Sequence, residues 1–397
     1  DLHSFPTRRS SDLWQNADAI EKYLFSCYHF LPDIRREYVA ISLLTGGEVI
    51  SSVGLTSDKF VLGTYSPTNP IYYDWNNYFK GIVQCHLLLK NIDKAPDLEE
   101  DIKRLYKAEV TFLIGYYHAL IYRLYGPVII YDEDYVNQNF GVNLESKDFR
   151  ERNSLDESLE YIISKIDEAI ALGLKDGYFE SHYFGRVNKQ TALAVKALLL
   201  AQAASPLYNG AHDPNNPQAD DLRSFYQDFT NSEGKPLMNL TYDPTKWEKA
   251  VDAFKAAIEA AEKAGYQIYE NVPYSQKFPK DSYQRNLRFF AMDYENTQEI
   301  IWCDARQETG WSLQRLCIPY STNEQGKGCV GPTLQYLYGF YTDKGVFIED
   351  DPDFRYKKNE SDKSEPKVGD VFLYGEQPNE ENGNLPKIGR ASCRERV

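Results

Sequence analysis

The sequence predicts a mainly α-helical fold made of paired helices, together with a loop-rich region that contains short strands. Two observations carry this prediction. Up to Tyr266, long segments place apolar residues at the three- and four-residue spacing of a helix. After Tyr266, short apolar runs such as residues 299–303 alternate with polar, glycine-containing stretches. Helices should therefore form a frame, and the loops set on that frame are where binding residues concentrate.

Six segments are predicted to be helices. Several end where a proline follows, at Pro32, Pro96 and Pro127, because proline cannot continue a helix. The second and third segments are joined by a short link and should form a helix hairpin. The six segments cover residues 14–31, 72–96, 99–127, 155–174, 188–204 and 245–266. Between the first two, residues 33–70 should be irregular, and residues 127–131 should be a short strand or an extended segment.

Two of these helices have distinctive patterns. The helix from Asn188 to Ala204 is apolar on nearly every side, with Asn188 as its N-cap and Pro206 as its stop. We therefore expect it to be buried around most of its circumference. Residues 245–266 alternate bulky and small apolar residues in a pattern that resembles a tetratricopeptide helix, although the regular repeat of such proteins is not visible.

Composition limits the classes of protein to which the chain can belong. Its 397 residues, of which 42% are hydrophobic, are enough for one large or two ordinary domains with a sizeable core. A formal net charge of -15 argues against binding a phosphate backbone, so we expect no nucleic-acid partner. The 31 tyrosines suit binding surfaces, although many of them will serve helix packing.

The two ends differ from the rest of the chain. Residues 1–13 and 388–397 lack periodicity and resemble translated adapter DNA, so we expect both to be non-native tails. The remainder, 14–387, should form a single domain whose C-terminal part is missing. Within it, the helical frame should cover about 14–266 and the loop-rich binding region about 267–387. We expect the true termini, including any lipid-bearing one, to be absent.

The common catalytic and metal-binding motifs are not found. The sequence contains neither a Gly-x-Ser-x-Gly elbow nor a His-Glu-x-x-His pair, and the acidic run at 349–354 lacks the spacing of a calcium loop. The cysteines outside the tails, which lack zinc spacing, are expected to be buried thiols. We therefore predict no catalytic residues, no metal ligands and no cofactor. A glycosidase with two facing carboxylates stays an alternative, because their separation cannot be read from sequence.

Glu109 is an acid on an otherwise apolar helix face, where its burial is costly unless a partner satisfies it. We interpret it as a structural, hydrogen-bonded carboxylate.

Aromatic residues provide the candidate binding site. Trp311 follows a glycine in a polar loop, where a core role is unnatural. Sugars stack their C–H faces on such rings and form hydrogen bonds with polar neighbours. The predicted ligand-binding set is Trp311, Arg315, Tyr320, Asn323, Trp75 and Tyr283.

Four segments together resemble the SusD/RagB family of outer-membrane nutrient-binding lipoproteins. Residues 185–189 (GRVNK) and 204–209 (ASPLYN) are similar to the two halves of its helix signature. Residues 72–93, 108–130 and 331–345 are similar to three further segments. The family usually has arginine after Phe-Leu, where this chain has Ile114, so Glu109 needs another partner, for which Arg186 is the candidate.

This resemblance implies a superhelix of tetratricopeptide-like helix pairs. It also implies a surface-exposed lipoprotein of the outer membrane, held by a lipid anchor that this sequence lacks. Its partners would be an oligosaccharide and a SusC-like TonB-dependent transporter, and its role would be binding rather than catalysis. Capture of peptides, as in RagB-like proteins, and a tetratricopeptide-like scaffold for a protein partner are the alternatives.

Overall fold

The structure is a computed structural model, and it is described here for the following residues: 14–32, 46–51, 58–66, 68–71, 74–140, 150–177, 183–216, 218, 220–268, 282–292, 298–304, 330–333, 336, 338–340, 345–347, 350, 355–357 and 370–372. Contacts divide the chain into two compact units. Unit 1 comprises Asp1–Leu31 and Asp74–Arg306, and unit 2 comprises Pro32–Tyr73 and Gln307–Val397.

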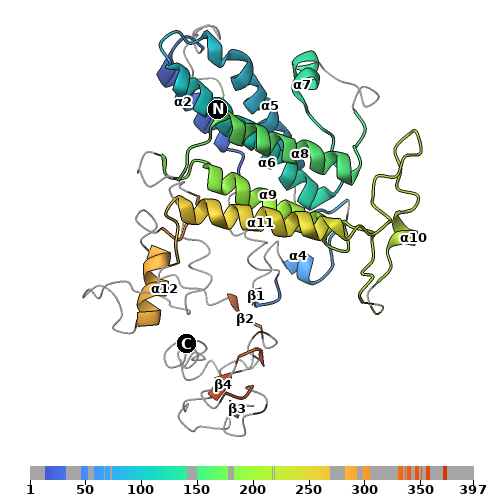
Figure 1. Cartoon of the computed structure of the whole chain (residues 1–397). Coiled ribbons are helices and arrows are strands. Elements are labelled where there is room, and N and C mark those ends of the chain that lie inside the picture. The colour runs from blue at the N-terminus through green and yellow to red at the C-terminus, as the bar shows by residue number, and fades with distance from the viewer. Residues whose placement is uncertain are drawn as a thin grey trace, which may run out of the picture. The chain divides into compact units, whose positions relative to one another are not determined.

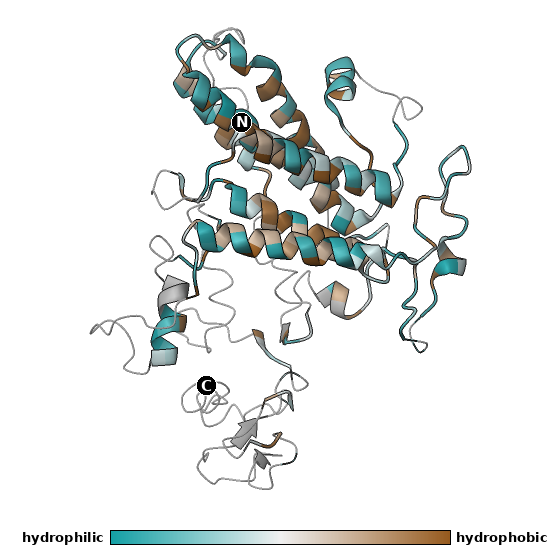
Figure 2. Cartoon of the chain, viewed as in Figure 1, coloured by the Kyte–Doolittle hydropathy of each residue, from teal (hydrophilic) through white to brown (hydrophobic). Residues whose placement is uncertain are grey.

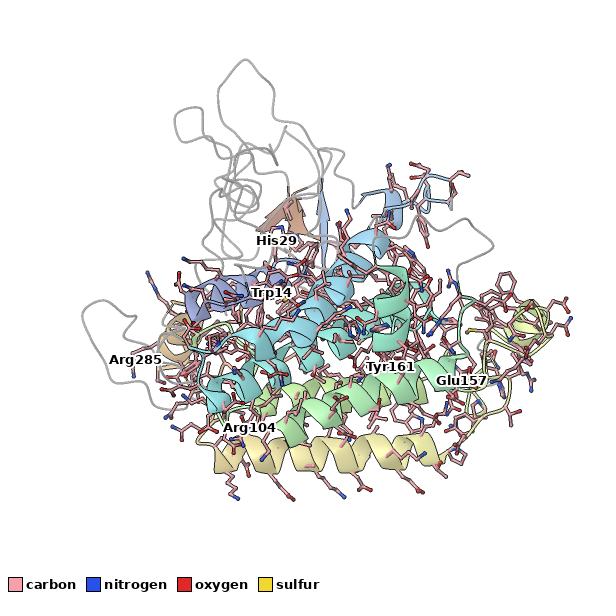
Figure 3. All side chains as sticks on the ribbon, turned by 90° about the horizontal axis from the view of Figure 1, so that it is seen from above. Trp14, His29, Arg104, Glu157, Tyr161 and Arg285 are labelled. Carbon is pink, nitrogen blue, oxygen red and sulfur yellow. The ribbon has the colours of Figure 1, made fainter. Side chains whose placement is uncertain are left out.

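Unit 1 is a run of packed helices. Its long members are α2 (Ala17–Tyr28), α5 (Trp75–Asn91), α6 (Glu100–Tyr125), α8 (Leu155–Leu172), α9 (Lys189–Ala204) and α11 (Thr245–Lys263). α2 contacts α5 and α6, α5 contacts α6, and then α6 contacts α8, α8 contacts α9 and α9 contacts α11. Figures 1 and 3 show these helices as successive layers, with α11 at the outer edge. This stacking confirms the predicted mainly helical, tetratricopeptide-like architecture.

α6 is the central helix of this core. Phe112, Tyr117 and Tyr122 are fully buried on it, and burying each such side chain contributes about 1.5–3 kcal/mol. Gly115 lets α6 approach α8 closely, because a Cβ there would lie 3.2 Å from the carbonyl oxygen of Ile162. The predicted hairpin of residues 72–96 and 99–127 therefore supplies the centre on which the later helices pack.

α9 begins and ends where the sequence predicts. The side chain of Asn188 caps it by accepting a hydrogen bond from the backbone N–H of Thr191 at 2.8 Å. The helix was expected to be buried on most sides, and Leu198, which is 62% exposed, marks a side that is open to water. Figure 2 shows hydrophobic residues along α9, whereas hydrophilic residues interrupt them along α11.

The turn after α9 closes a long excursion of the chain. Asn209 is buried, and its amide donates to the carbonyl oxygen of Asp243 at 2.8 Å while its own oxygen accepts from the N–H of Asp243 at 2.8 Å. Gly210 has a φ of 97°, and a Cβ on it would lie 2.9 Å from the backbone nitrogen of Tyr242. The Asn-Gly pair is therefore required by the backbone here.

Unit 2 contains the short strands. β1 (Val49–Ser51) pairs antiparallel with β2 (Val330–Pro332), with Ile50 opposite Gly331. β3 (Arg355–Lys357) pairs in parallel with β4 (Asp370–Phe372). β1 and the single-turn helix α4 (Asp58–Val61) fall in residues 33–70, so the prediction that this whole segment is irregular is wrong at these two elements.

Unit 1 also contains shorter elements that were not predicted. These are a 3₁₀ turn (Ile92–Lys94), α7 (Glu133–Asn139), α10 (Arg223–Tyr226) and α12 (Ser282–Met292). Of the two alternatives for residues 127–131, the structure shows the extended one. None of the helices in the described ranges is both long and apolar enough to cross a membrane.

Candidate functional site

Glu109 lies at a buried junction of three segments. Its Oε1 accepts from Nη2 of Arg186 at 2.5 Å, and its Oε2 accepts from Nε of Arg186 at 3.1 Å and from the hydroxyl of Tyr28 at 2.7 Å. The hydroxyl of Tyr28 in turn accepts from the N–H of Val187 at 3.1 Å. The predicted pairing of Glu109 with Arg186 is thereby confirmed.

This junction joins α2, α6 and the segment before α9. Burial raises the pKa of Glu109, while the guanidinium of Arg186 and the hydroxyl of Tyr28 oppose that rise. The guanidinium of Arg186 lies 5.2 Å from the ring centre of Tyr106 and 4.9 Å from that of Tyr183. Glu109 has no exposed surface and both its oxygens are bonded, so its role here is structural.

Trp75 is the predicted site residue that the structure describes most fully. Its ring meets those of Phe79 and Tyr125 edge to face, with both pairs of centres 5.1 Å apart. The guanidinium of Arg152 lies over the same ring, 5.0 Å from its centre, and donates to the carbonyl oxygen of Tyr125 at 3.0 Å. Trp75 therefore positions Arg152, whose charge borders an open pocket.

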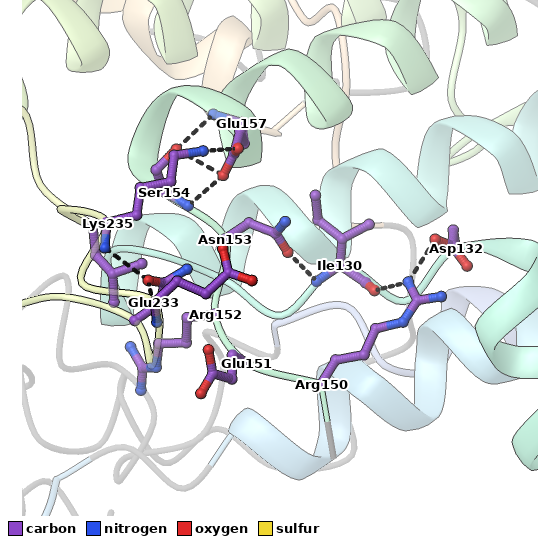
Figure 4. Close-up of a pocket in the computed structure, with 12 residues that line it drawn as sticks. Ile130, Asp132, Arg150, Glu151, Arg152, Asn153, Ser154, Glu157, Glu233 and Lys235 are labelled. Carbon is purple, nitrogen blue, oxygen red and sulfur yellow. Dashed lines mark hydrogen bonds and ion pairs between the residues drawn. The ribbon is translucent and has the colours of Figure 1, made fainter. Parts of the chain in front are cut away.

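That pocket lies between residues 130–132, 150–157 and 231–237 (Figure 4). We call it the charged pocket, and its volume is about 490 Å³. Most of its lining is charged or amide-bearing, so it offers many hydrogen-bonding groups and little apolar surface. The lining residues are Ile130, Asp132, Arg150, Glu151, Arg152, Asn153, Ser154, Glu157, Asn231, Glu233, Lys235 and Leu237.

Two ion pairs order the charged pocket. Arg150 donates to Oδ2 of Asp132 at 2.6 Å and to the carbonyl oxygen of Ile130, as Figure 4 shows. Partial burial raises the pKa of Asp132, but bonds from Arg150 and the N–H of Tyr135 lower it more, so the net shift is downward. Glu157 is paired with Lys235 and caps α8 together with Ser154. The bond from Lys235, then those from Ser154, lower the pKa of Glu157 to about 2.

Two buried histidines hold the wall of this pocket, and we call them the histidine clamp. Nδ1 of His118 donates to the carbonyl oxygen of Ile114 at 2.7 Å, which leaves its Nε2 to accept from the N–H of Tyr131 at 3.1 Å. Nε2 of His86 lies 3.0 Å from the carbonyl oxygen of Tyr131 and donates to it. His118 is therefore neutral, burial lowers the pKa of His86, and together the two histidines fix the backbone between Ile130 and Asp132.

The remaining predicted site residues are not brought together by the described structure. Tyr283 is strongly exposed on α12. Trp311, Arg315, Tyr320 and Asn323 lie outside the described residues. Trp302, an aromatic of the loop-rich region, packs in the core instead: its Nε1 donates to the carbonyl oxygen of Gly185 at 3.0 Å.

An exposed aromatic pair in unit 2 was missed. The rings of Phe60, in α4, and of Tyr65, in the turn that follows it, are nearly parallel. The sequence contained a signal for this pair, because one aromatic residue lies shortly before Gly63 and another shortly after it, much as Trp311 follows a glycine. The pair was missed because residues 33–70 were predicted only to be irregular.

Comparison with known proteins gives a consistent result. Residues 52–199 match a SusD-like family described as starch-binding and associating with the outer membrane. No curated protein matches the sequence. Among solved structures, a protein named BT4246 is 26% identical, with a TM-score of 0.67 over 86% of this chain and 59% of that one.

Two structures from Bacteroides fragilis share the fold at lower identity. One is a SusD-like protein, 18% identical, with a TM-score of 0.57 over 85% of this chain and 55% of its own. The other is a SusD-like carbohydrate-binding protein, 16% identical, with a TM-score of 0.55 over 86% of this chain and 57% of its own. The chain thus spans less than three fifths of the length of each of these matched structures.

Proposed function

We propose that this chain is a SusD/RagB-type protein that captures oligosaccharides at the cell surface without chemically changing them. It then passes them to a SusC-like, TonB-dependent transporter in the outer membrane, to which a lipid anchor holds it close. The observation that carries this proposal is the match of residues 52–199 to a family described as starch-binding and associating with the outer membrane.

The geometry of unit 1 supports a binding role. The charged pocket presents guanidinium, carboxylate and amide groups, which are the groups that bind sugar hydroxyls. Its charges are held in place by one another and by Trp75, so little side-chain freedom is lost on binding. The aromatic pair in unit 2 offers ring faces of the kind on which sugars stack.

A glycan and peptide array probed with the full chain tests this proposal, followed by calorimetry and product analysis on each hit. We expect retention of at least one oligosaccharide, recovered unchanged. Sugar products of altered length would contradict a non-catalytic role. Retention of peptides alone would favour RagB-like capture, and the net charge of -15 would then select basic peptides.

The predicted site at Trp311, Arg315, Tyr320 and Asn323 stays part of the proposal. Trp311→Ala should weaken glycan affinity by about 2- to 10-fold, the value of one aromatic stacking contact. Trp247→Ala is the matched control, because Trp247 is exposed on α11 and falls outside residues 267–387 of the sequence. Equal affinities of the two variants would move the site away from Trp311.

A further inference from the structure

The aromatic pair of unit 2 has the geometry of a stacking platform. The ring centres of Phe60 and Tyr65 are 5.5 Å apart, and their planes differ by only 6°. The two residues are 45% and 50% exposed, so each ring faces its neighbour on one side and about half of each residue is in contact with water. Two parallel aromatic faces held open to solvent match the flat C–H face of a pyranose ring.

The turn that carries the platform is braced from within. Phe60 lies in the single turn of α4, which ends at Val61, and the chain reverses at Gly63, whose φ is 63°. The N–H of Gly63 donates to the carbonyl oxygen of Phe60 at 3.1 Å, and that of Thr64 to the carbonyl oxygen of Lys59 at 2.9 Å. Because the backbone fixes both ring positions, a ligand does not have to order them on binding.

A second pair of bonds closes the other end of the turn. Ser66 and Asn69 exchange backbone hydrogen bonds of 3.2 and 3.0 Å, so the strand-like bridge between them follows directly after Tyr65. The side chain of Asn69 folds back and donates to the carbonyl oxygen of Thr64 at 3.4 Å. An exposed amide is thereby held on the same turn as the rings.

The residue before Phe60 is the positively charged Lys59. Nζ of Lys59 donates to Oδ1 of Asn69 at 3.1 Å, which uses one of its three donors. The ion pairs of the described residues do not include Lys59, unlike Lys22, Lys107 and Lys196, which face carboxylates. In a chain with a net charge of -15, an ammonium group that forms no ion pair with a carboxylate of the described residues is positioned for an anion.

We propose that Phe60, Tyr65, Lys59 and Asn69 form a binding site for an anionic oligosaccharide, one whose rings carry carboxylate groups as in uronic acids. The inference rests on the proposed function and deepens it by naming a ligand class and a site. The rings stack on the sugar, the ammonium group of Lys59 pairs with its carboxylate, and the amide of Asn69 bonds its hydroxyls.

The test uses oligosaccharides made of galacturonate, glucuronate or mannuronate, each beside its carboxyl-reduced neutral form. Affinities of the full chain are measured by calorimetry at low salt. The variants are Phe60→Ala, Tyr65→Ala and Lys59→Met, with Phe225→Ala and Lys249→Met as matched controls on exposed positions of unit 1. Circular dichroism confirms that each variant is folded.

We expect at least one uronate oligosaccharide to bind more tightly than its neutral form. Each ring variant should weaken both forms about 2- to 10-fold. Lys59→Met should weaken only the acidic form, by about 2- to 5-fold, the value of an exposed ion pair, and salt should remove the difference. The controls should leave both affinities unchanged.

Two results would overturn the inference. Glycan binding that is unaffected by the ring variants would leave the proposed function standing and remove this site. Neutral forms that bind as well as the acidic forms in every pair would remove the ligand class. Failure of the chain to bind any glycan, acidic or neutral, would instead overturn the proposed function itself.

Discussion

The buried junction around Glu109 and the rim of the charged pocket each contain an ion pair between an arginine and a carboxylate, in two different environments. At the junction, the side chains of Arg186 and Glu109 are 6% and 0% exposed, whereas those of Arg150 and Asp132 at the rim are 39% and 38% exposed. A pair that is cut off from water is costly to break, because either partner left alone is an unsolvated charge. A pair in contact with water is replaced by hydration at little cost. Stability should therefore reside in the first pair, and recognition of ligands in the second.

Breaking the buried pair should have the largest effect. Arg186→Met leaves the carboxylate of Glu109 buried with only Tyr28 as a donor, so it should lower the free energy of unfolding by about 3–5 kcal/mol. Urea denaturation of the full chain, monitored by circular dichroism, measures this loss. Arg104→Met is the control, because Arg104 and Asp101 form an exposed pair, and it should cost less than about 1 kcal/mol. Equal costs would contradict the contrast between the two environments.

His118 of the histidine clamp should make the stability of the fold depend on pH. Burial lowers the pKa of His118 to about 4, below its ordinary value of 6.5. As pH falls, the unfolded chain therefore binds a proton at His118 at a higher pH than the folded chain does. The stability that His118 contributes is complete above pH 6.5 and is lost as pH falls toward 4, by about 3 kcal/mol in total.

His118→Gln removes this titration, so the fall in unfolding free energy between pH 6.5 and 4 should become smaller by about that amount. Urea denaturation at several pH values measures it. The natural chain, measured over the same pH range, is the reference. An unchanged slope in His118→Gln would show that His118 does not set it.

The cap of α8 should give a smaller effect. Ser154→Ala removes the hydroxyl that accepts from the N–H of Glu157, at a cost of about 1 kcal/mol. It also removes one donor to Glu157, so the pKa of that carboxyl should rise from about 2 toward its ordinary value of 4.5. Thermal unfolding and NMR titration check both effects. Ser164→Ala, exposed on the same helix, should change stability by less than about 0.5 kcal/mol.

Changing the rim pair should affect stability least. Arg150→Gln should cost below about 1 kcal/mol, and its effect should shrink in salt. The pKa of Asp132 should rise, because the bond from Arg150 helps to lower it. NMR titration in low and high salt measures both. A loss as large as that of Arg186→Met would show that the rim pair stabilises the fold as the buried pair does.

The helical frame was predictable because its pattern is local. The apolar spacing of residues 72–96 and 99–127 and the proline stops place α5 and α6 within a few residues of their observed bounds. α7 and α12 were missed because short helices carry too few periodic positions to distinguish them from loops. The exposure of Leu198 was also missed, since composition shows that a helix is apolar but not how many neighbours it has.

The candidate site was less predictable. The cost of a buried charge predicted that Glu109 needs a partner, and the resemblance to the SusD/RagB segments made Arg186 the candidate. The charged pocket joins residues 130–132, 150–157 and 231–237, and no local pattern shows that three polar loops meet. Similarly, Trp75 looked like a ring available to a ligand, and only the fold shows Arg152 lying over it.

The reciprocal bonds between Asn209 and Asp243 also bear on how this protein can change during evolution. The two ends of the excursion between them are joined at its base, so the start of α11 is held near the end of α9 by bonds outside the excursion. Doubling the length of such a loop costs only about 0.6 kcal/mol in closure entropy. Within the excursion, the N–H of Leu222 donates to the carbonyl oxygen of Ala211 at 2.8 Å, so the chain between these two residues can change in length while α9 and α11 are inherited unaltered, whereas residues 231–237 are held by their place in the charged pocket.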